Sequence, residues 1–266
     1  MPDGTVFHNI GQGSEVLKVA TIQYYYTSNI GRVRRTNQDN FLVPGGIFMP
    51  WDNRGTAGVL SGSAPTQERP VFAVFDGMGG EECGEIAAAI GVQTLANADL
   101  TGDAVQALQE VCFVANENIC RYTAENNITS MGTTAAILQL TDDGACLCNI
   151  GDSKIFALSG GSFVQLSVDH VAIAPFGKKP PLSQNLGIPP EELIIEPFLA
   201  TGNYFPGDVF LLCSDGLTDM VTPERIGQIL SSEPGDQAAQ CLLQEALENG
   251  GKDNVTFILL YVLYHE

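Results

Sequence analysis

The chain lacks the long hydrophobic run that a membrane-spanning helix needs. No apolar stretch among its 266 residues approaches the ~18 residues of such a helix. Its first residues also lack the succession of basic, apolar and small residues that marks a secretory signal. We therefore expect a soluble, cytoplasmic protein with no membrane partner.

Cysteine is present but forms no recognisable framework. The seven cysteines are odd in number and scattered, and no Cys-x-x-Cys pair occurs among them. His8, His170 and His265 are spaced too widely to complete a zinc cluster. Several cysteines lie in apolar runs, where a thiol acts as a small hydrophobic group. This pattern indicates a reduced protein, in agreement with the cytoplasmic location.

Basic residues are few. The chain has 12 Lys and Arg against 31 Asp and Glu, which gives a formal net charge of −19. Nucleic acid is not an expected partner, because a phosphate backbone requires a basic face. We attribute most of the acidity to solubility, and the remaining carboxylates are available to hold divalent cations.

The apolar pattern predicts strands and helix pairs in separate blocks. Strands are expected at 20–26, 71–75, 134–140, 145–150, 154–158, 163–166, 209–213 and 255–263, and helices at 82–99, 103–125, from Thr222 onward and at 234–248. Turn residues between the middle strands indicate an antiparallel meander. We expect an α+β fold, with residues 1–16 as a loose lead-in and 17–266 as one domain. Residues 44–69 are expected to form a long irregular connection or a hairpin with insertions, and residues 171–190 a loop.

Two of the apolar runs end in an aspartate followed by glycine. Val71–Phe75 leads into Asp76-Gly77, and Val209–Cys213 leads through Ser214 into Asp215-Gly216. Glycine allows a sharp turn and a close approach of the backbone. A third aspartate, Asp253, directly precedes the last predicted strand. Clustered carboxylates repel each other, so the three together indicate a cation site.

Further motifs join these three in a fixed order. They are Gly31-Arg32-Val33-Arg34-Arg35-Thr36-Asn37-Gln38-Asp39-Asn40, Asp76-Gly77-Met78-Gly79-Gly80, Gly132-Thr133-Thr134, Ile150-Gly151-Asp152-Ser153, Ser214-Asp215-Gly216 and Lys252-Asp253-Asn254-Val255-Thr256. In this order and at these separations, the set resembles the metal-dependent, type 2C protein serine/threonine phosphatases, particularly their bacterial branch. The resemblance covers roughly residues 20–262.

The resemblance implies a fold and an activity. The fold is a four-layer α-β-β-α sandwich, in which two antiparallel sheets pack face to face and helix pairs flank them. The activity is hydrolysis of phosphoserine and phosphothreonine in phosphorylated proteins, by in-line attack of a water that bridges two Mn²⁺ or Mg²⁺ ions. It also implies a role in signalling, and we expect a monomer.

The same resemblance implies roles for individual residues. Asp76 bridges the two ions, and the Gly77 carbonyl ligates one of them. Asp215 and Asp253 are ligands, and Asp39 acts mainly through water. Two further residues complete the set, Asp152 as a ligand of a possible third ion and Arg34 as the phosphate-binding arginine.

Elementary chemistry agrees with these roles. Oxygen ligands that leave room for water suit Mg²⁺ or Mn²⁺. Two such ions can activate a water and stabilise an in-line displacement at phosphorus. A guanidinium offers a planar fork to two phosphate oxygens. Asn254 and Thr256 are expected to fix the turn around Asp253.

Two departures from the family pattern concern the surroundings of the site. Many eukaryotic relatives have histidine at the position of Met78, so the usual candidate for protonating the leaving group is absent. The flap segment near 171–187 is short, and Lys178-Lys179 is its one basic pair. The short flap leaves the choice of substrate open and does not change the expected metal chemistry.

Three alternatives remain to be weighed. A cysteine-dependent phosphatase needs an arginine six positions after its cysteine, and no cysteine here has one. A nucleotide-binding loop would need Gly-Lys-Ser/Thr, which is absent. A regulatory binding module on a degenerate phosphatase fold is the rival of a different class. Such a module is expected to lack one of Arg34, Asp76, Asp215 and Asp253, all of which are present.

Overall fold

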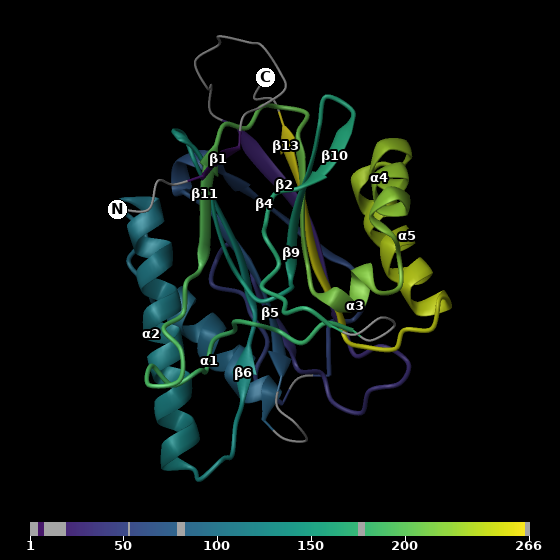
Figure 1. The fold of residues 1–266 in the computed structure, drawn as a ribbon. Helices are drawn as coiled ribbons and strands as arrows, with labels where there is room; N and C mark the ends of the chain where they lie inside the picture. Colours follow the sequence, from purple (N-terminus) through teal and green to yellow (C-terminus); the bar gives the residue numbers. More distant parts are fainter. Residues whose placement is uncertain (1–4, 8–19, 53, 79–82, 175–178, 264–266) are drawn as a thin grey trace.

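Two β-sheets packed face to face form the centre of the structure (Figure 1). The computed structural model describes residues 5–7, 20–52, 54–78, 83–174 and 179–263. One sheet, the β5 sheet, has the order β1 (Thr5–Phe7), β11 (Phe198–Gly202), β8 (Gly144–Ile150), β7 (Ala135–Thr141), β5 (Val71–Met78) and β3 (Asp39–Leu42), with β6 (Gly132–Thr133) paired to β5. The other, the β13 sheet, has the order β10 (Ser162–Gln165), β9 (Lys154–Ser159), β12 (Val209–Cys213), β13 (Val255–Leu263), β2 (Thr21–Asn29) and β4 (Leu60–Pro65).

Helices cover the outer face of each sheet. The β5 sheet is covered by α1 (Gly84–Ala96) and α2 (Ala104–Glu125), and the β13 sheet by α4 (Pro223–Ser232) and α5 (Gly235–Glu248). Figure 1 shows the two pairs on opposite sides of the sheets. A short helix, α3 (Asp215–Thr218), follows β12, and a 3₁₀ turn, Thr66–Glu68, follows β4. The four-layer sandwich predicted from the sequence is confirmed.

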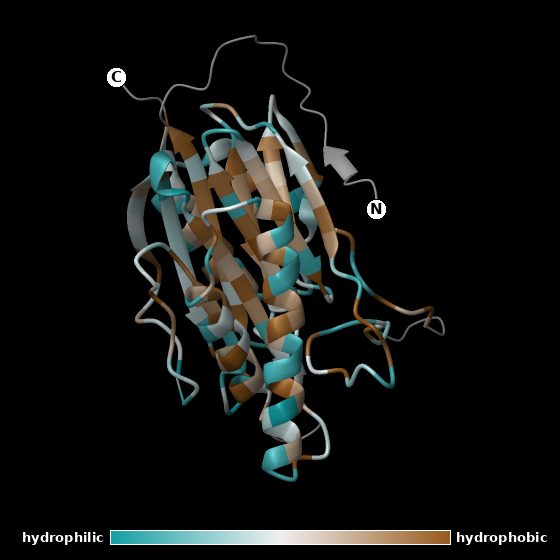
Figure 2. Ribbon diagram, turned by 90° about the vertical axis from the view of Figure 1, so that its left-hand side faces the viewer, coloured by the Kyte–Doolittle hydropathy of each residue, from teal (hydrophilic) through white to brown (hydrophobic). Residues whose placement is uncertain are grey.

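The core consists of three apolar layers. Between the sheets, aromatic and branched side chains interdigitate, among them Phe72, Phe210 and Leu260. Separate layers lie between each sheet and its helix pair. Figure 2 shows hydrophobic and hydrophilic residues alternating along α2, and the buried residues of this helix, among them Leu108, Ala115 and Ile119, belong to the layer against the β5 sheet. The central strands are buried on both faces, which explains their nearly continuous apolar sequences.

Local sequence sets the helix boundaries and packing. Asp103 caps α2 by accepting a hydrogen bond from the Gln106 amide at 2.9 Å, and Thr222 caps α4 by accepting one from the Arg225 amide at 3.3 Å. Gly91 lets α1 lie close to the sheet, because a Cβ there would stand 2.9 Å from the ring of Phe75. None of the helices in the described ranges combines the length and apolar composition that a bilayer span requires.

The structure has five strands that the sequence did not predict, and one of them is the two-residue β6. β3 has four residues and β11 follows a proline-rich segment, so neither has a clear pattern. β4 lies inside the segment expected to be an irregular connection or a hairpin, as an edge strand of β2. β1 lies within the predicted loose lead-in and pairs with β11 in parallel, while all the other pairs are antiparallel. The rest of that lead-in lies outside the described residues.

Candidate active site

Four predicted carboxylates come from both sheets and approach one end of the sandwich. Asp39 begins β3 and pairs in register with Asp76 on β5. Asp215 follows β12 and begins α3, and Asp253 precedes β13. Three of them, Asp76, Asp215 and Asp253, line a cavity of about 420 Å³ together with Asp152. The structure therefore brings together residues that lie up to 214 positions apart (253 − 39).

The predicted Thr133-Thr134 motif holds Asp76 in place. The Asp76 amide donates to Thr134 Oγ1 at 3.0 Å, and its carbonyl accepts from the Thr134 amide at 2.9 Å and from Thr133 Oγ1 at 3.0 Å. Thr134 Oγ1 also lies 2.6 Å from Ser153 Oγ, beside Asp152. These bonds position the backbone around Asp76 and leave its carboxylate available to the cavity.

Two glycines of the Asp-Gly motifs are required by close backbone approach. A Cβ on Gly77 would collide with the carbonyls of Gln38 and Gly84, and a Cβ on Gly216 would collide with the carbonyl of Asn254. The close approach of Gly77 to Gln38 brings the arginine-bearing segment, residues 31–40, to the end of β5. The contact of Gly216 brings the Asp215 turn against the Asp253 turn. Glycine is thus needed for proximity of the segments.

Asp39 lies behind the cavity and joins the two sheets. Its side chain is buried, and Oδ2 accepts a hydrogen bond from Ser214 Oγ at 2.8 Å. Ser214 lies next to Asp215, so this bond couples the start of β3 to the end of β12. Thr256 also hydrogen-bonds to Asp39. The sequence did not predict this role of Ser214, and serine before Asp-Gly is too common in turns to be a signal by itself.

Burial and mutual repulsion disfavour the ionised form of the aspartic acids at this site. Burial, and then repulsion from Asp39 and Asp215, raises the pKa of Asp76 well above its usual value. Burial also raises the pKa of Asp39, although hydrogen bonds from Ser214 and Thr256 oppose the shift. The pKa of Asp152 rises to about 6 through burial and then through repulsion by Asp215. A bound cation would relieve this repulsion.

The donor set fits a cation that keeps several water ligands. No three Asp, Glu, His or Cys side chains in the described part of the chain form a ready-made ligand group. The cavity instead offers separate carboxylates around open space. Mg²⁺ and Mn²⁺ are commonly held by one or two carboxylates with water completing the coordination, whereas structural zinc needs a closed cage. Asp76, Asp215 and Asp253 therefore suit the hard divalent cations and not zinc.

Arg34 lies against this group. Its Nη2 donates to Asp253 Oδ2 at 2.6 Å, and about half of the side chain is exposed, at 49%. Of the three clustered arginines, Arg34 is the one that lines the cavity. Asn254 holds the arginine segment by donating to the carbonyls of Ile30 and Thr36 at 2.9 and 3.0 Å and accepting from the Gln38 amide at 2.8 Å. The predicted structural role of Asn254 is confirmed.

A second basic side chain, that of Lys179, reaches the cavity from the flap segment. Lys179 Nζ donates to Asp215 Oδ2 and, at 3.1 Å, to Asp219 Oδ2. Asp219 lies in the first turn after Asp215, and its carboxylate binds this lysine. Sequence reasoning identified Lys179 as half of a basic pair and did not predict its partners. Lys179 and Asp215 are 36 positions apart, and no local sequence pattern indicates a contact between them.

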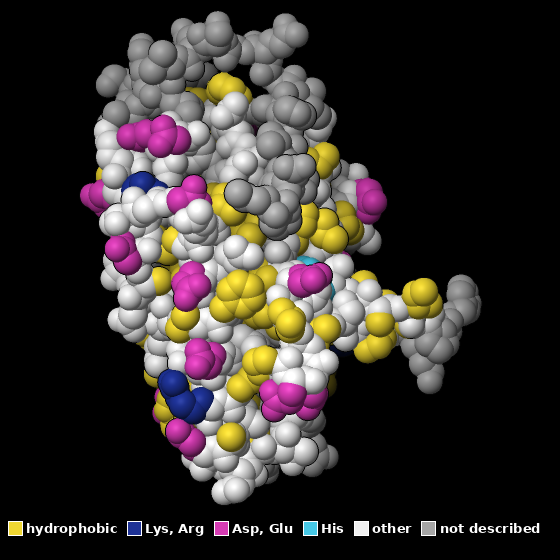
Figure 3. Space-filling view, turned by 60° about the vertical axis from the view of Figure 1, so that its left-hand side comes forward, with side chains coloured by type: hydrophobic (Ala, Val, Ile, Leu, Met, Phe, Trp, Pro, Cys, Tyr) yellow, Lys and Arg dark blue, Asp and Glu magenta, His cyan; other side chains and the backbone are white. Residues whose placement is uncertain are grey.

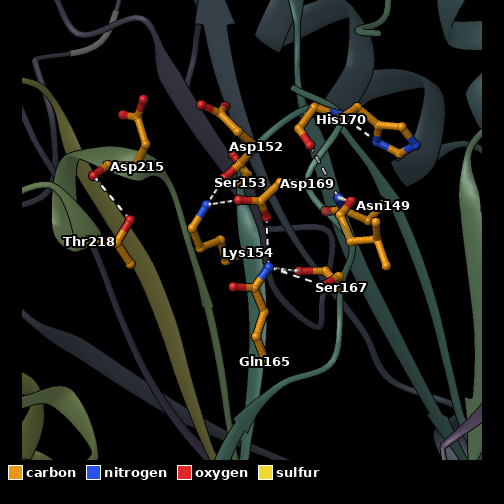
Figure 4. Close-up of polar contacts among 12 residues, drawn as sticks. Asn149, Asp152, Ser153, Lys154, Gln165, Ser167, Asp169, His170, Asp215 and Thr218 are labelled. Carbon is orange, nitrogen blue, oxygen red and sulfur yellow. Dashed lines mark hydrogen bonds and ion pairs between the residues drawn. The ribbon is translucent and has the colours of Figure 1, made fainter. Parts of the chain in front are cut away.

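The Asp152 turn is fixed by a polar network beneath the flap (Figure 4). Lys154 Nζ donates to the Asp152 carbonyl at 2.9 Å and to Asp169 Oδ2 at 2.6 Å. Gln165 also donates to Asp169, at 2.7 Å. Figure 4 shows the carboxylates of Asp152 and Asp215 pointing to the same side, away from this network. Asp169 therefore has a structural role.

His170 belongs to the same network. Its Nδ1 accepts from the Gly151 amide at 3.3 Å, and its own amide donates to the Gly151 carbonyl at 2.9 Å. The ring also hydrogen-bonds to the backbone of Glu196. Burial lowers the pKa of His170. The described residues that line the cavity include Met78 and no histidine.

His170→Ala is therefore expected to reduce kcat/KM on a phosphopeptide by less than about tenfold, because a true general acid contributes roughly 10²–10⁴-fold. The measurement is steady-state kinetics on a phosphothreonine peptide and on an aryl phosphate, whose leaving group departs without a proton. If the variant lost the alkyl substrate and kept the aryl one, His170 would be the acid.

Comparisons with known proteins agree with this geometry. A family model described as protein phosphatase 2C matches residues 61–249. The serine/threonine phosphatase stp of Listeria monocytogenes is 27% identical over 255 residues, which span 88% of this chain and 94% of that protein. The protein phosphatase PhpP of Streptococcus pneumoniae is 30% identical over 72% of this chain and 85% of its own length.

A solved structure gives the same result for the fold. The catalytic domain of the serine/threonine protein phosphatase PstP, determined with two manganese ions, superposes with a TM-score of 0.70 at 28% identity, over 92% of this chain and all of that one. Fold and site together define a serine/threonine protein phosphatase. The chain belongs to the protein phosphatase 2C family.

Proposed function

We propose that this chain removes phosphate from phosphoserine and phosphothreonine in proteins, with two Mn²⁺ or Mg²⁺ ions held by Asp76, the Gly77 carbonyl, Asp215 and Asp253. The observation that carries the proposal is the cavity itself. Carboxylates from both sheets line it, and burial and repulsion raise the pKa of Asp76. When bound, a pair of such ions activates a water and stabilises charge at phosphorus.

The side chains around the ions have separate tasks. Arg34 is half exposed at the rim and can turn its guanidinium toward a phosphoryl group while Asp253 continues to accept from it. Asp39 is buried behind Asp76 and bonded to Ser214, which suits a role through water. Asp152 lines the same cavity as Asp215 and is the candidate ligand for a third ion.

We also propose a cytoplasmic signalling phosphatase that acts as a monomer, with residues 17–266 as its one domain. No disulfide joins any of the seven cysteines, all of which lie in the described ranges, and a reducing compartment keeps thiols in this state. Figure 3 shows scattered acidic side chains and sparse basic ones on the face that it draws, which disfavours nucleic acid as a partner. Phosphorylated proteins remain the proposed substrates.

The test of this function is turnover of a phosphothreonine peptide by chelator-treated protein, before and after addition of Mn²⁺ or Mg²⁺. We expect no phosphate release after chelation and recovery with Mn²⁺. A phosphotyrosine peptide of the same sequence serves as control and should be a poorer substrate. Full turnover in metal-stripped protein would contradict the metal mechanism, and tight peptide binding without turnover would favour a regulatory binding module.

A further inference from the structure

The flap segment returns to the site at a defined place. Val171 and Leu182 form a β-bridge, the Ala172 amide donates to the Pro181 carbonyl at 2.9 Å, and the Ser183 amide donates to the His170 carbonyl at 2.9 Å. These bonds close the base of the segment directly above the Asp152 turn, to which His170 is also bonded. Lys179 lies three positions before Leu182, at this closed base.

The sequence around Lys179 restricts its backbone. Pro180 and Pro181 follow it, so the φ angles of both are fixed and Lys179 itself is pushed toward an extended conformation. A lysine held in this way loses less conformational entropy when its ammonium binds than one on a free loop. The ammonium also has a high effective concentration at the site, because it is part of the same chain.

Two carboxylates bind the Lys179 ammonium, which donates to Asp215 and Asp219. Asp152 lines the same cavity as Lys179, and the charge of the lysine lowers the pKa of Asp152 against the effect of burial. Burial disfavours the charged form of Lys179, but Asp215 and then Asp219 outweigh this and raise its pKa. The other lysine near Asp152, Lys154, is bound to Asp169.

We propose that Lys179 is a built-in cation that occupies the third-ion position between Asp152 and Asp215, so that this phosphatase works with two divalent ions and binds a third only weakly. The inference rests on the proposed function, because Asp215 is also a proposed ligand of the two divalent ions. A lysine ammonium supplies one positive charge and three donors to this group, and it repels a divalent cation brought to the same carboxylates.

The experiment counts bound Mn²⁺ by isothermal titration calorimetry and by elemental analysis after equilibrium dialysis. It compares the unmodified chain with Lys179→Met, which keeps an unbranched side chain only one heavy atom shorter and removes its charge. We expect two tightly bound ions in the unmodified chain and a third in Lys179→Met, with at least tenfold higher affinity at the third site. Lys178→Met makes the same change one position earlier and should leave two ions.

Lys179→Arg separates charge from side-chain size and should also retain two tight ions. Circular dichroism checks that each variant is folded. If Lys179→Met unfolds, Lys179→Arg still tests the inference, because a third tightly bound ion in Lys179→Arg would overturn it. Equal third-site affinity in the unmodified chain and Lys179→Met, or an equal gain in Lys178→Met, would overturn the inference alone. If neither the unmodified chain nor any variant bound Mn²⁺, both the inference and the proposed function would be wrong.

Discussion

Asp76→Asn is expected to lower kcat by about three orders of magnitude, because several kcal/mol of transition-state stabilisation would depend on the ions that we propose this carboxylate holds. Asn keeps the shape of the side chain but removes its charge. The hydrogen bonds that position the residue come from its own backbone, so the fold should be retained. Tight Mn²⁺ binding should be lost together with turnover.

Two further variants separate this explanation from a general loss of charge. Asp253→Asn should also lose tight Mn²⁺ binding and turnover, because Asp253 is the proposed ligand from the opposite sheet. Asp143→Asn removes an exposed carboxylate in the turn between β7 and β8 and should change neither quantity. The measurements are Mn²⁺ titration and phosphopeptide kinetics. Normal Mn²⁺ affinity in Asp76→Asn would show that the ions are held elsewhere.

Arg34→Ala is expected to reduce kcat/KM by roughly tenfold or more, chiefly through a higher KM, because a charge-assisted hydrogen bond is worth about 1.5–3 kcal/mol. Product inhibition by inorganic phosphate should weaken in parallel. Mn²⁺ binding should stay near normal, since arginine is not a ligand. Steady-state kinetics with added phosphate, combined with Mn²⁺ titration, measure all three effects.

The matched control lies one residue away. Arg35 is exposed in the same segment and does not line the cavity, so Arg35→Ala should leave kcat/KM within about twofold, as expected of a surface change of up to ~0.5 kcal/mol. Arg34→Lys keeps the charge without the planar fork and should give an intermediate loss. An effect of Arg35→Ala equal to that of Arg34→Ala would show that the phosphate-binding arginine was wrongly chosen.

The sequence predicted the parts of this protein that have local signatures. Asp76 and Asp215 were recognisable because each follows an apolar run and precedes a glycine at which a side chain would collide with a neighbouring segment. The helix α4 was recognisable from its Thr222-Pro223-Glu224 cap. By contrast, β3 and β11 owe their strand conformation to pairing with β5 and β8, which local propensity does not encode.

Contacts between distant segments were the least predictable. The bond from Ser214 to Asp39 spans 175 positions, and the pairing of Lys179 with Asp215 depends on where a proline-rich segment returns. Both follow from the packing of the two sheets and not from residue type alone. The role of Arg34 at the cavity was reached only through its spacing from Asp39 and the resemblance to a family.

Because the carboxylates come from two different sheets, ions held by them as proposed would join the two sheets. Asp39 and Asp76 belong to the β5 sheet, and Asp215 and Asp253 flank strands of the β13 sheet. An ion bound by both sides resists their separation, and each tenfold excess of ion over its dissociation constant adds about 1.4 kcal/mol to the free energy of unfolding. Metal supply would then govern how long the protein survives proteolysis as well as how fast it works, because degradation follows the unfolded fraction.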